Sequence, residues 1–156
     1  MEEITSLALD VDGVLTDGTF WWGPGGEEFK RFSFRDVMGL SRGMKAGLRV
    51  VLISGEDTPL LDLYATKLGI QDLYRGCKDK ASALKEYSET RGIPLKSICF
   101  MGDDINDLAA MGIAGSSAVP ADGHPAVLKA AKRVMGYPGG NGAVREWVDL
   151  WLLQRG

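Results

Sequence analysis

The sequence has few of the residues that build disulfide frameworks or histidine-based metal sites. Its 156 residues include only two cysteines, Cys77 and Cys99, and one histidine, His124. Two isolated thiols without metal-ligand spacing argue against a disulfide scaffold and favour a reducing compartment. The lone histidine precedes Pro125 and is typical of a loop, and it cannot form a histidine-based metal site alone.

An excess of positive charge and a long hydrophobic run are also missing. Eighteen basic against 21 acidic residues give a net charge of −3, which does not favour binding to a nucleic-acid backbone. The N-terminal stretch MEEITSLALD begins with acidic residues and has only a short apolar run. We therefore expect no signal peptide, no membrane span and a cytoplasmic location.

What the sequence does contain is an alternation of apolar runs and amphipathic stretches. Short apolar runs predict strands at residues 4–9, 49–53 and 97–101. Helical patterns lie at residues 36–46, 58–68, 79–91, from about 105, and at 143–154. This order predicts an α/β fold, with a Rossmann-like, mostly parallel sheet and helices on both faces. The whole chain, residues 1–156, is expected to form a single domain.

One segment interrupts the alternation directly after the first strand. Residues 19–34 read as strand, turn and strand, with glycines and a proline at 23–26, and so predict an inserted β-hairpin. Its aromatic residues Phe20, Trp21 and Trp22 either contact another subunit or fold back on their own domain. Trp147 and Trp151 are one helical turn apart and are expected on the core face of the last helix.

Acidic residues follow two of the predicted strands. Asp10 and Asp12 end the first strand and share a face because alternate residues of an extended chain point the same way. Asp103 and Asp107, in the segment GDDIND, follow the strand at 97–101. Since the carboxyl ends of parallel strands meet at one edge, these carboxylates should converge. Such crowding requires a cation or a proton, and oxygen ligands at a phosphate site favour Mg²⁺. Turn formation by the Asp-Gly pairs, or capping of the following helix by Asp104, is the structural alternative.

These two segments, DVDGVLTDG and GDDIND, resemble the first and last motifs of the haloacid dehalogenase superfamily of phosphatases. The resemblance implies that Asp10 is the nucleophile and Asp12 the general acid/base. It implies that Asp10 and Asp103 ligate Mg²⁺, with Asp107 in support and with the Val11 backbone carbonyl, rather than the Asp12 side chain, as a further ligand. The match extends to a phosphate-binding pair, Ser54 and Gly55, and to a lysine that holds phosphate and nucleophile, Lys80.

The short chain, the hairpin, and the segments FRD at 34–36, KDK at 78–80 and GGNGAVRE at 139–146 are similar to one capless subfamily. Its members dephosphorylate 3-deoxy-2-ulosonic acid phosphates and form homotetramers through their hairpins. Glu56 and Lys67 are similar to the members that act on nine-carbon, sialic-acid-type 9-phosphates, although the arginines of those relatives are absent between them. The expectation leans to that substrate, with the eight-carbon 3-deoxy-D-manno-octulosonate 8-phosphate as the alternative. Glu56, Lys67 and Arg145 are candidate substrate contacts or, equally, surface residues.

Two other classes of function remain open on the sequence. A sugar phosphotransferase would use the same chemistry, but the absence of a cap that excludes water argues against it. A non-catalytic interaction module would have no physical reason to keep Asp10, Asp12, Lys80 and Asp103 together.

Overall fold

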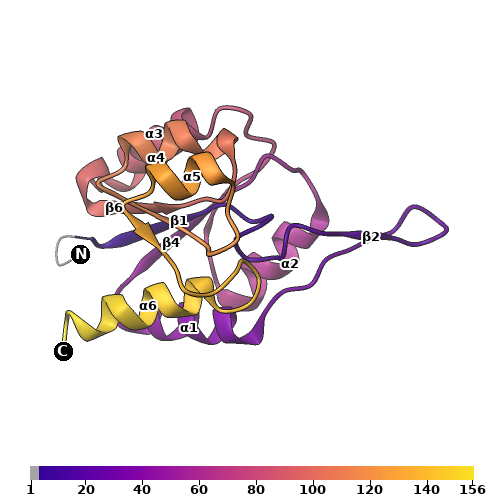
Figure 1. The fold of residues 1–156 in the computed structure, drawn as a ribbon, viewed down its shortest axis with the longest axis horizontal. Coiled ribbons are helices and arrows are strands. Elements are labelled where there is room, and N and C mark those ends of the chain that lie inside the picture. The colour runs from indigo at the N-terminus through magenta and orange to yellow at the C-terminus, as the bar shows by residue number, and fades with distance from the viewer. Residues whose placement is uncertain (1–3) are drawn as a thin grey trace.

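The computed structural model describes residues 4–156, and within them six short strands form one parallel sheet (Figure 1). The order across the sheet is β5-β4-β1-β6-β7-β8. The strands are β1 (Ser6–Leu9), β4 (Arg49–Ile53), β5 (Asp72–Tyr74), β6 (Ile98–Met101), β7 (Ser116–Val119) and β8 (Arg133–Val134). From β1 the chain goes first to β4 and later crosses to β6 on the other side of β1. Strand order therefore reverses at β1, where open α/β sheets bind ligands.

Helices cover both faces of this sheet. They are α1 (Phe34–Lys45), α2 (Pro59–Leu68), α3 (Lys80–Arg91), α4 (Leu108–Ile113), α5 (Pro125–Ala130) and α6 (Ala143–Leu153), with 3-10 turns at Leu95–Ser97 and Ile105–Asp107. Figure 1 shows α3, α4 and α5 on one side of the sheet and α1 and α6 on the other. The three-layer arrangement follows from strands that are apolar on both faces.

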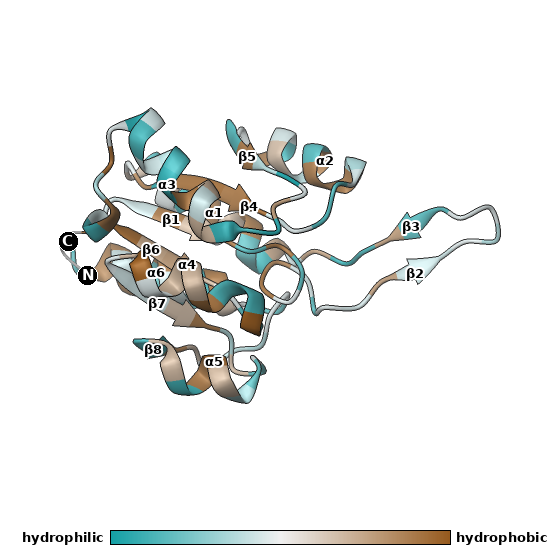
Figure 2. Ribbon diagram, turned by 90° about the horizontal axis from the view of Figure 1, so that it is seen from above, coloured by the Kyte–Doolittle hydropathy of each residue, from teal (hydrophilic) through white to brown (hydrophobic). Residues whose placement is uncertain are grey.

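Alternation along the strands divides the buried side chains between two cores. In β1, Leu7 and Leu9 pack against α1 and α6, whereas Ala8 faces α3 and α4. In β6 the same period sends Cys99 to the first core and Phe100 to the second. In Figure 2 strands such as β4 and β6 are mostly brown, whereas helices such as α3 include teal and pale residues.

The hairpin projects away from the rest of the subunit (Figures 1 and 2). Its strands β2 (Trp21–Trp22) and β3 (Glu28–Phe29) pair antiparallel, with Trp21 opposite Phe29. Trp21 and Trp22 are 75% and 72% exposed, and Phe20 is also exposed. The aromatics therefore do not fold back on their own subunit, and one of the two sequence-based alternatives is wrong.

The predicted fold class is confirmed, and the predicted strands and helices lie within a few residues of the observed ones. Trp147 and Trp151 are buried in the core as expected. The strands β5, β7 and β8 and the helix α5 were not predicted. Each has six residues or fewer, and β7 begins Ser116-Ser117, so periodicity has too few positions to separate them from loops.

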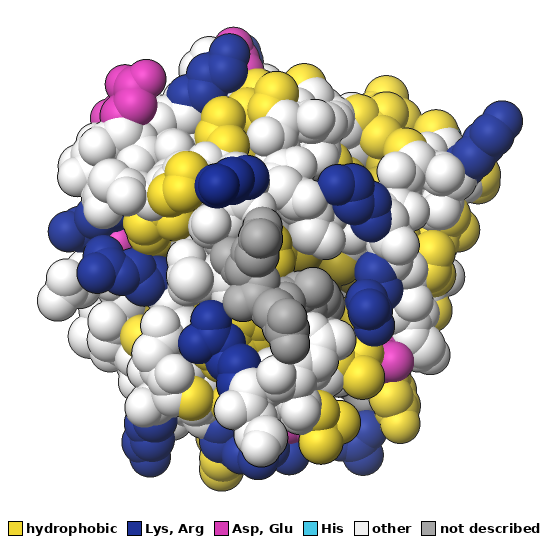
Figure 3. All heavy atoms as spheres, turned by 90° about the vertical axis from the view of Figure 1, so that its left-hand side faces the viewer, with side chains coloured by type: hydrophobic (Ala, Val, Ile, Leu, Met, Phe, Trp, Pro, Cys, Tyr) yellow, Lys and Arg dark blue, Asp and Glu magenta, His cyan; other side chains and the backbone are white. Residues whose placement is uncertain are grey.

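The face at the amino ends of the strands carries mostly Lys and Arg among its charged side chains (Figure 3). A helix that follows a parallel strand must end near the start of the next strand, so helix C-termini lie at this face. Basic residues in the last turn, such as Lys45 of α1 and Arg91 of α3, suit the negative end of a helix dipole. Within residues 4–156, no helix has the length and apolar character needed to cross a bilayer.

Candidate active site

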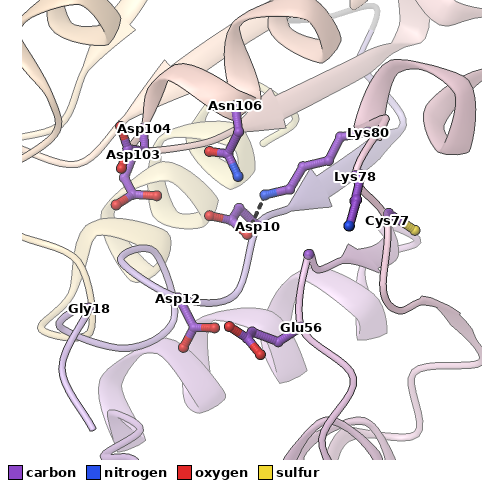
Figure 4. A pocket seen from close by; sticks show the side chains of 11 residues that line it. Asp10, Asp12, Gly18, Glu56, Cys77, Lys78, Lys80, Asp103, Asp104 and Asn106 are labelled. Carbon is purple, nitrogen blue, oxygen red and sulfur yellow. Dashed lines mark hydrogen bonds and ion pairs between the residues drawn. The ribbon is translucent and has the colours of Figure 1, made fainter.

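A cavity of about 510 Å³ opens at the carboxyl edge of the sheet, beside β1 and β6 (Figure 4). Both acidic segments singled out in the sequence reach it. Its lining is Asp10, Asp12, Gly18, Gly55, Glu56, Cys77, Lys78, Lys80, Asp103, Asp104 and Asn106. The structure therefore brings together most of the predicted site residues.

A buried lysine lies between two buried aspartates at the base of this cavity. Lys80 Nζ is 2.7 Å from Asp10 Oδ1 and 2.7 Å from Asp107 Oδ1, and the Lys80 side chain is 2% exposed. Burial lowers the pKa of the Lys80 ammonium, but the two carboxylates outweigh it and the net shift is upward. Lys80 therefore stays protonated and holds Asp10 in place.

Lys80 owes this position to the start of α3. The Asp79 side chain caps the helix by accepting from the Ser82 amide at 3.0 Å. The first helical residue, Lys80, then extends into the cavity. The helix dipole disfavours a cation at the helix N-terminus, and the ion pairs of Lys80 with Asp10 and Asp107 offset that cost.

Asp107 shapes the loop that carries Asp103. Its Oδ2 accepts from the backbone amides of Asp103 at 2.9 Å and Asp104 at 3.2 Å. Asp104 points its own carboxylate to the Ile105 amide and caps the short 3-10 turn. Capping, the structural alternative, is thus a role of Asp104, although Asp104 also lines the cavity together with Asp103.

The carboxylates of Asp10, Asp103 and Asp107 have oxygens that all lie within 4.8 Å of one another. Burial, then the neighbouring Asp107, raises the pKa of Asp10 well above its usual range. Burial likewise raises the pKa of Asp103 to about 6. When all three are ionised, the single Lys80 charge leaves two negative charges uncompensated. Hard oxygen donors with this charge deficit fit a divalent cation such as Mg²⁺.

The Val11 carbonyl does not fit the ligand role that was expected of it. It accepts backbone hydrogen bonds from Leu15 at 2.9 Å and Thr16 at 3.2 Å, because the chain turns tightly after β1. Its lone pairs are used within that turn. Gly13 has φ of +86° there, and a Cβ at Gly13 would overlap the Asp103 carboxylate, so this position requires glycine.

Asp12 lies across the cavity from the carboxylate of Asp103 (Figure 4) and is one-third exposed. Figure 4 shows its carboxylate pointing towards that of Glu56. Its partner is Lys30, at 2.9 Å from Oδ1. Lys30 was not predicted as a site residue, because it is 18 positions away in the sequence and no spacing rule links the hairpin to Asp12.

The predicted phosphate-binding pair follows β4. Gly55 lines the cavity, while Ser54 is buried beneath it and its Oγ accepts from the Glu56 amide at 3.1 Å. Cys77, Lys78 and Asn106 also line the cavity and were not predicted. Lys78 belongs to the KDK segment noted in the sequence, and its ammonium points inward (Figure 4).

Two of the three predicted substrate contacts lie outside this cavity. Lys67, in the last turn of α2, stands over the Phe34 ring with Nζ 5.4 Å from its centroid. Arg145, on α6, pairs with Asp149 at 2.7 Å. Only Glu56 shares the cavity with Asp10. Within this chain, therefore, Lys67 and Arg145 do not join Glu56.

The glycine-rich loop before α6, residues 139–142, packs against the loop that follows β1. Gly140 N donates to the Val14 carbonyl at 2.9 Å, and side chains at Gly139 or Gly140 would overlap the backbone of Gly13 or Thr16. Asp36 caps α6 from a distance, accepting from Arg145 N at 3.0 Å. The close approach of the two backbones explains why glycine occupies both positions.

A parallel α/β sheet with clustered carboxylates and a buried lysine at its carboxyl edge defines a metal-dependent enzyme of phosphate chemistry. Residues 53–146 match the family model described as haloacid dehalogenase-like hydrolase. The chain is 39% identical over 155 residues to the 3-deoxy-D-manno-octulosonate 8-phosphate phosphatase KdsC of Escherichia coli K12, covering 99% of this chain and 82% of the relative.

Solved structures agree with this match. The phosphatase of the same name from Moraxella catarrhalis, in complex with magnesium ion, phosphate ion and a KDO molecule, has a TM-score of 0.95 and 34% identity, covering 97% of this chain and 87% of that one. The cobalt-bound Haemophilus influenzae enzyme has a TM-score of 0.94 and 36% identity, covering 97% and 89%. The chain therefore belongs to the haloacid dehalogenase-like hydrolase family. It is a phosphatase, as predicted, and the non-catalytic alternative is not supported.

Proposed function

We propose that this phosphatase hydrolyses the phosphomonoester of a 3-deoxy-2-ulosonic acid, with 3-deoxy-D-manno-octulosonate 8-phosphate as its substrate. The supporting observation is the similarity to phosphatases of that name, which extends over 99% of the chain and therefore includes the hairpin and both cavity edges. The lean towards a nine-carbon 9-phosphate rested on Glu56 and Lys67. It is not supported, because those relatives bear the eight-carbon name and Lys67 lies away from the cavity.

In the proposed reaction Asp10 is the nucleophile. A carboxylate oxygen of Asp10 attacks phosphorus, the bond from phosphorus to the ester oxygen breaks, and Asp12 gives its proton to the departing alkoxide. Water then attacks the aspartyl phosphate, the bond from phosphorus to Asp10 breaks, and the proton of the water goes to Asp12. Inorganic phosphate leaves, and both aspartates return to their starting states.

The remaining residues hold the phosphate and the ion. We assign Lys80 to Asp10 and the phosphoryl oxygens, and Ser54 and Gly55 to the phosphoryl group. The cofactor is Mg²⁺, which would be held by Asp10 and Asp103 with Asp107 in support, and which neutralises charge on the transferring phosphoryl group. The Val11 carbonyl is left out because it is used within its own turn.

The whole chain is proposed to act as one catalytic domain within a homotetramer. The exposed Trp21 and Trp22 on a projecting hairpin are costly to leave in water. Contacts between hairpins would bury them and bring a neighbouring subunit towards each cavity. Lys67 and Arg145 would then contact the substrate of a neighbouring subunit.

A substrate panel tests the proposal. We expect Mg²⁺-dependent release of phosphate from the eight-carbon 8-phosphate, with kcat/KM at least about tenfold above that for the nine-carbon 9-phosphate and for hexose 6-phosphates, a difference of about 1.4 kcal/mol in transition-state binding. Asp10→Asn serves as the inactive control. A preference for the nine-carbon ester would restore the first expectation, and a preference for hexose phosphates would contradict the ulosonate class altogether.

A further inference from the structure

A second lysine, whose side chain is largely buried, contacts Asp12. Lys30 Nζ lies 2.9 Å from Asp12 Oδ1 and 3.1 Å from Asp12 Oδ2. Its side chain is only 5% exposed, although lysine ammonium groups usually reach solvent. Lys30 directly follows β3, so it comes from the returning strand of the hairpin.

The surroundings of Asp12 explain why such a contact matters. Asp12 is one-third exposed, and the carboxylate of Glu56 faces it in Figure 4. Glu28 is also near, at 3.7 Å from Lys30 Nζ. Without a cation, like charges would turn the Asp12 carboxylate away from its neighbours and into solvent. Among the described residues, Lys30 is the cation that forms an ion pair with Asp12.

Asp10 and Asp12 each form an ion pair with a different lysine. Lys80 contacts Asp10 and Asp107, while Lys30 contacts Asp12. Lys30 reaches both oxygens of one carboxylate, and this fixes the rotation of that group as well as its position. A group that must give and take a proton works only when an oxygen lies within hydrogen-bond reach of the reacting atom.

We infer that Lys30 is a positioning residue that holds the Asp12 carboxyl group towards the ester oxygen and the attacking water. This inference rests on the proposed role of Asp12. It also makes the hairpin part of the active site, since Lys30 directly follows β3, the strand that pairs with the tryptophan-bearing β2.

Alkyl and aryl phosphate esters should respond differently to the loss of Lys30. An alkyl ester leaves as a basic alkoxide and needs the Asp12 proton when its bond to phosphorus breaks. An aryl ester such as p-nitrophenyl phosphate leaves as a weakly basic phenolate and needs no proton. Hydrolysis of the aspartyl phosphate needs Asp12 for both esters, because the proton of the water must go to it.

The test compares Lys30→Met with Arg31→Met in the full-length protein with Mg²⁺. Arg31 is the neighbouring hairpin cation, with an exposed side chain whose nearest acid is Asp17. We expect Lys30→Met to lower kcat on an alkyl phosphate about 10- to 100-fold, with KM little changed, because a misplaced Asp12 would keep only part of the roughly 10²–10⁴-fold that a positioned acid/base group contributes. Arg31→Met should match the wild type, and Lys30→Arg should recover part of the loss.

With p-nitrophenyl phosphate, Lys30→Met should release nitrophenol in a rapid burst equal to the enzyme concentration, followed by a slow steady rate. A purely structural role would instead slow the burst along with the steady rate. In an Asp12→Asn background, Lys30→Met should cause no further loss, because Lys30 acts through Asp12.

The outcomes distinguish the inference from the function on which it rests. Full activity in Asp12→Asn would overturn the proposed role of Asp12. A loss in Asp12→Asn with unchanged kcat in Lys30→Met would overturn the inference alone. Additive losses in the double variant, or a burst slowed as much as alkyl turnover, would also overturn it.

Discussion

Lys80 Nζ lies at equal distances of 2.7 Å from Asp10 and from Asp107, so a single ammonium group joins the ends of β1 and β6 through α3. This contact ties the proposed nucleophile to the residue that shapes the Asp103 loop. Lys80 should therefore contribute to the stability of the fold as well as to the chemistry of the site.

Lys80→Met should therefore destabilise the protein and abolish most activity. The substitution leaves Asp10 and Asp107 buried side by side without a cation, and breaking a buried ion pair typically costs about 3–5 kcal/mol. Urea unfolding in EDTA measures this loss, and Mg²⁺ should restore part of it. Lys85→Met, on the exposed face of the same helix, is the matched control and should change stability little.

Asp10→Asn should stop turnover while leaving the fold intact. An amide is nearly the same size as the carboxylate but is a far poorer nucleophile, so we expect kcat to fall by at least about a thousandfold. Phosphate release and the far-UV circular dichroism spectrum measure the two parts of this prediction. Normal phosphate release from this variant would exclude Asp10 as the nucleophile.

The folding stability of the metal-free protein should depend on pH, and part of this dependence should come from Asp103. Burial raises the pKa of Asp103 to about 6, against about 3.9 in an unfolded chain. The folded state therefore binds this proton more tightly, and the contribution of Asp103 to stability falls as pH rises from about 4 to 6. Asp10, whose pKa is also raised, acts in the same direction.

Thermal unfolding of wild type and Asp103→Asn in EDTA checks this, because surface ion pairs common to both cancel in the difference. We expect the variant to gain Tm relative to wild type between pH 4 and pH 7. Mg²⁺ should raise the Tm of wild type more at pH 7 than at pH 4, and should raise that of the variant less. A difference that is independent of pH would contradict the expectation.

Gly13→Ala should be far more damaging than Gly26→Ala. Both glycines have φ of +86°, so both substitutions carry the same backbone strain, about 1–2 kcal/mol. A Cβ at Gly13 would also overlap the Asp103 carboxylate, whereas Gly26 has nothing within 4 Å. Activity and Mg²⁺ affinity should fall in Gly13→Ala and stay near wild type in Gly26→Ala. Equal effects in the two variants would show that the Asp103 contact is unimportant.

The double substitution of Trp21→Ser and Trp22→Ser should dissociate the proposed tetramer. The two indoles are largely exposed in one subunit, and each buried aromatic side chain stabilises an interface by roughly 1.5–3 kcal/mol. Light scattering coupled to size exclusion measures the mass. A wild type that is monomeric at micromolar concentration would rule out the assembly, and a tetrameric variant would place its interface elsewhere.

The sequence alone was sufficient for the fold class and for the clustering of three carboxylates at the carboxyl edge of the sheet. Apolar runs that end in acidic segments indicated where β1 and β6 finish, and the shared edge of a parallel sheet brought Asp10, Asp103 and Asp107 together. These predictions succeeded because strand direction and edge are fixed by local patterns and by the right-handed βαβ connection.

Only the tertiary structure decided which side chains face one another across longer distances. The contact of Lys30 with Asp12, the separation of Lys67 and Arg145 from the cavity, and the use of the Val11 carbonyl within its turn depend on how the hairpin, the helices and the loops pack. Periodicity records which residues are buried, but it does not record the partner that a buried charge meets.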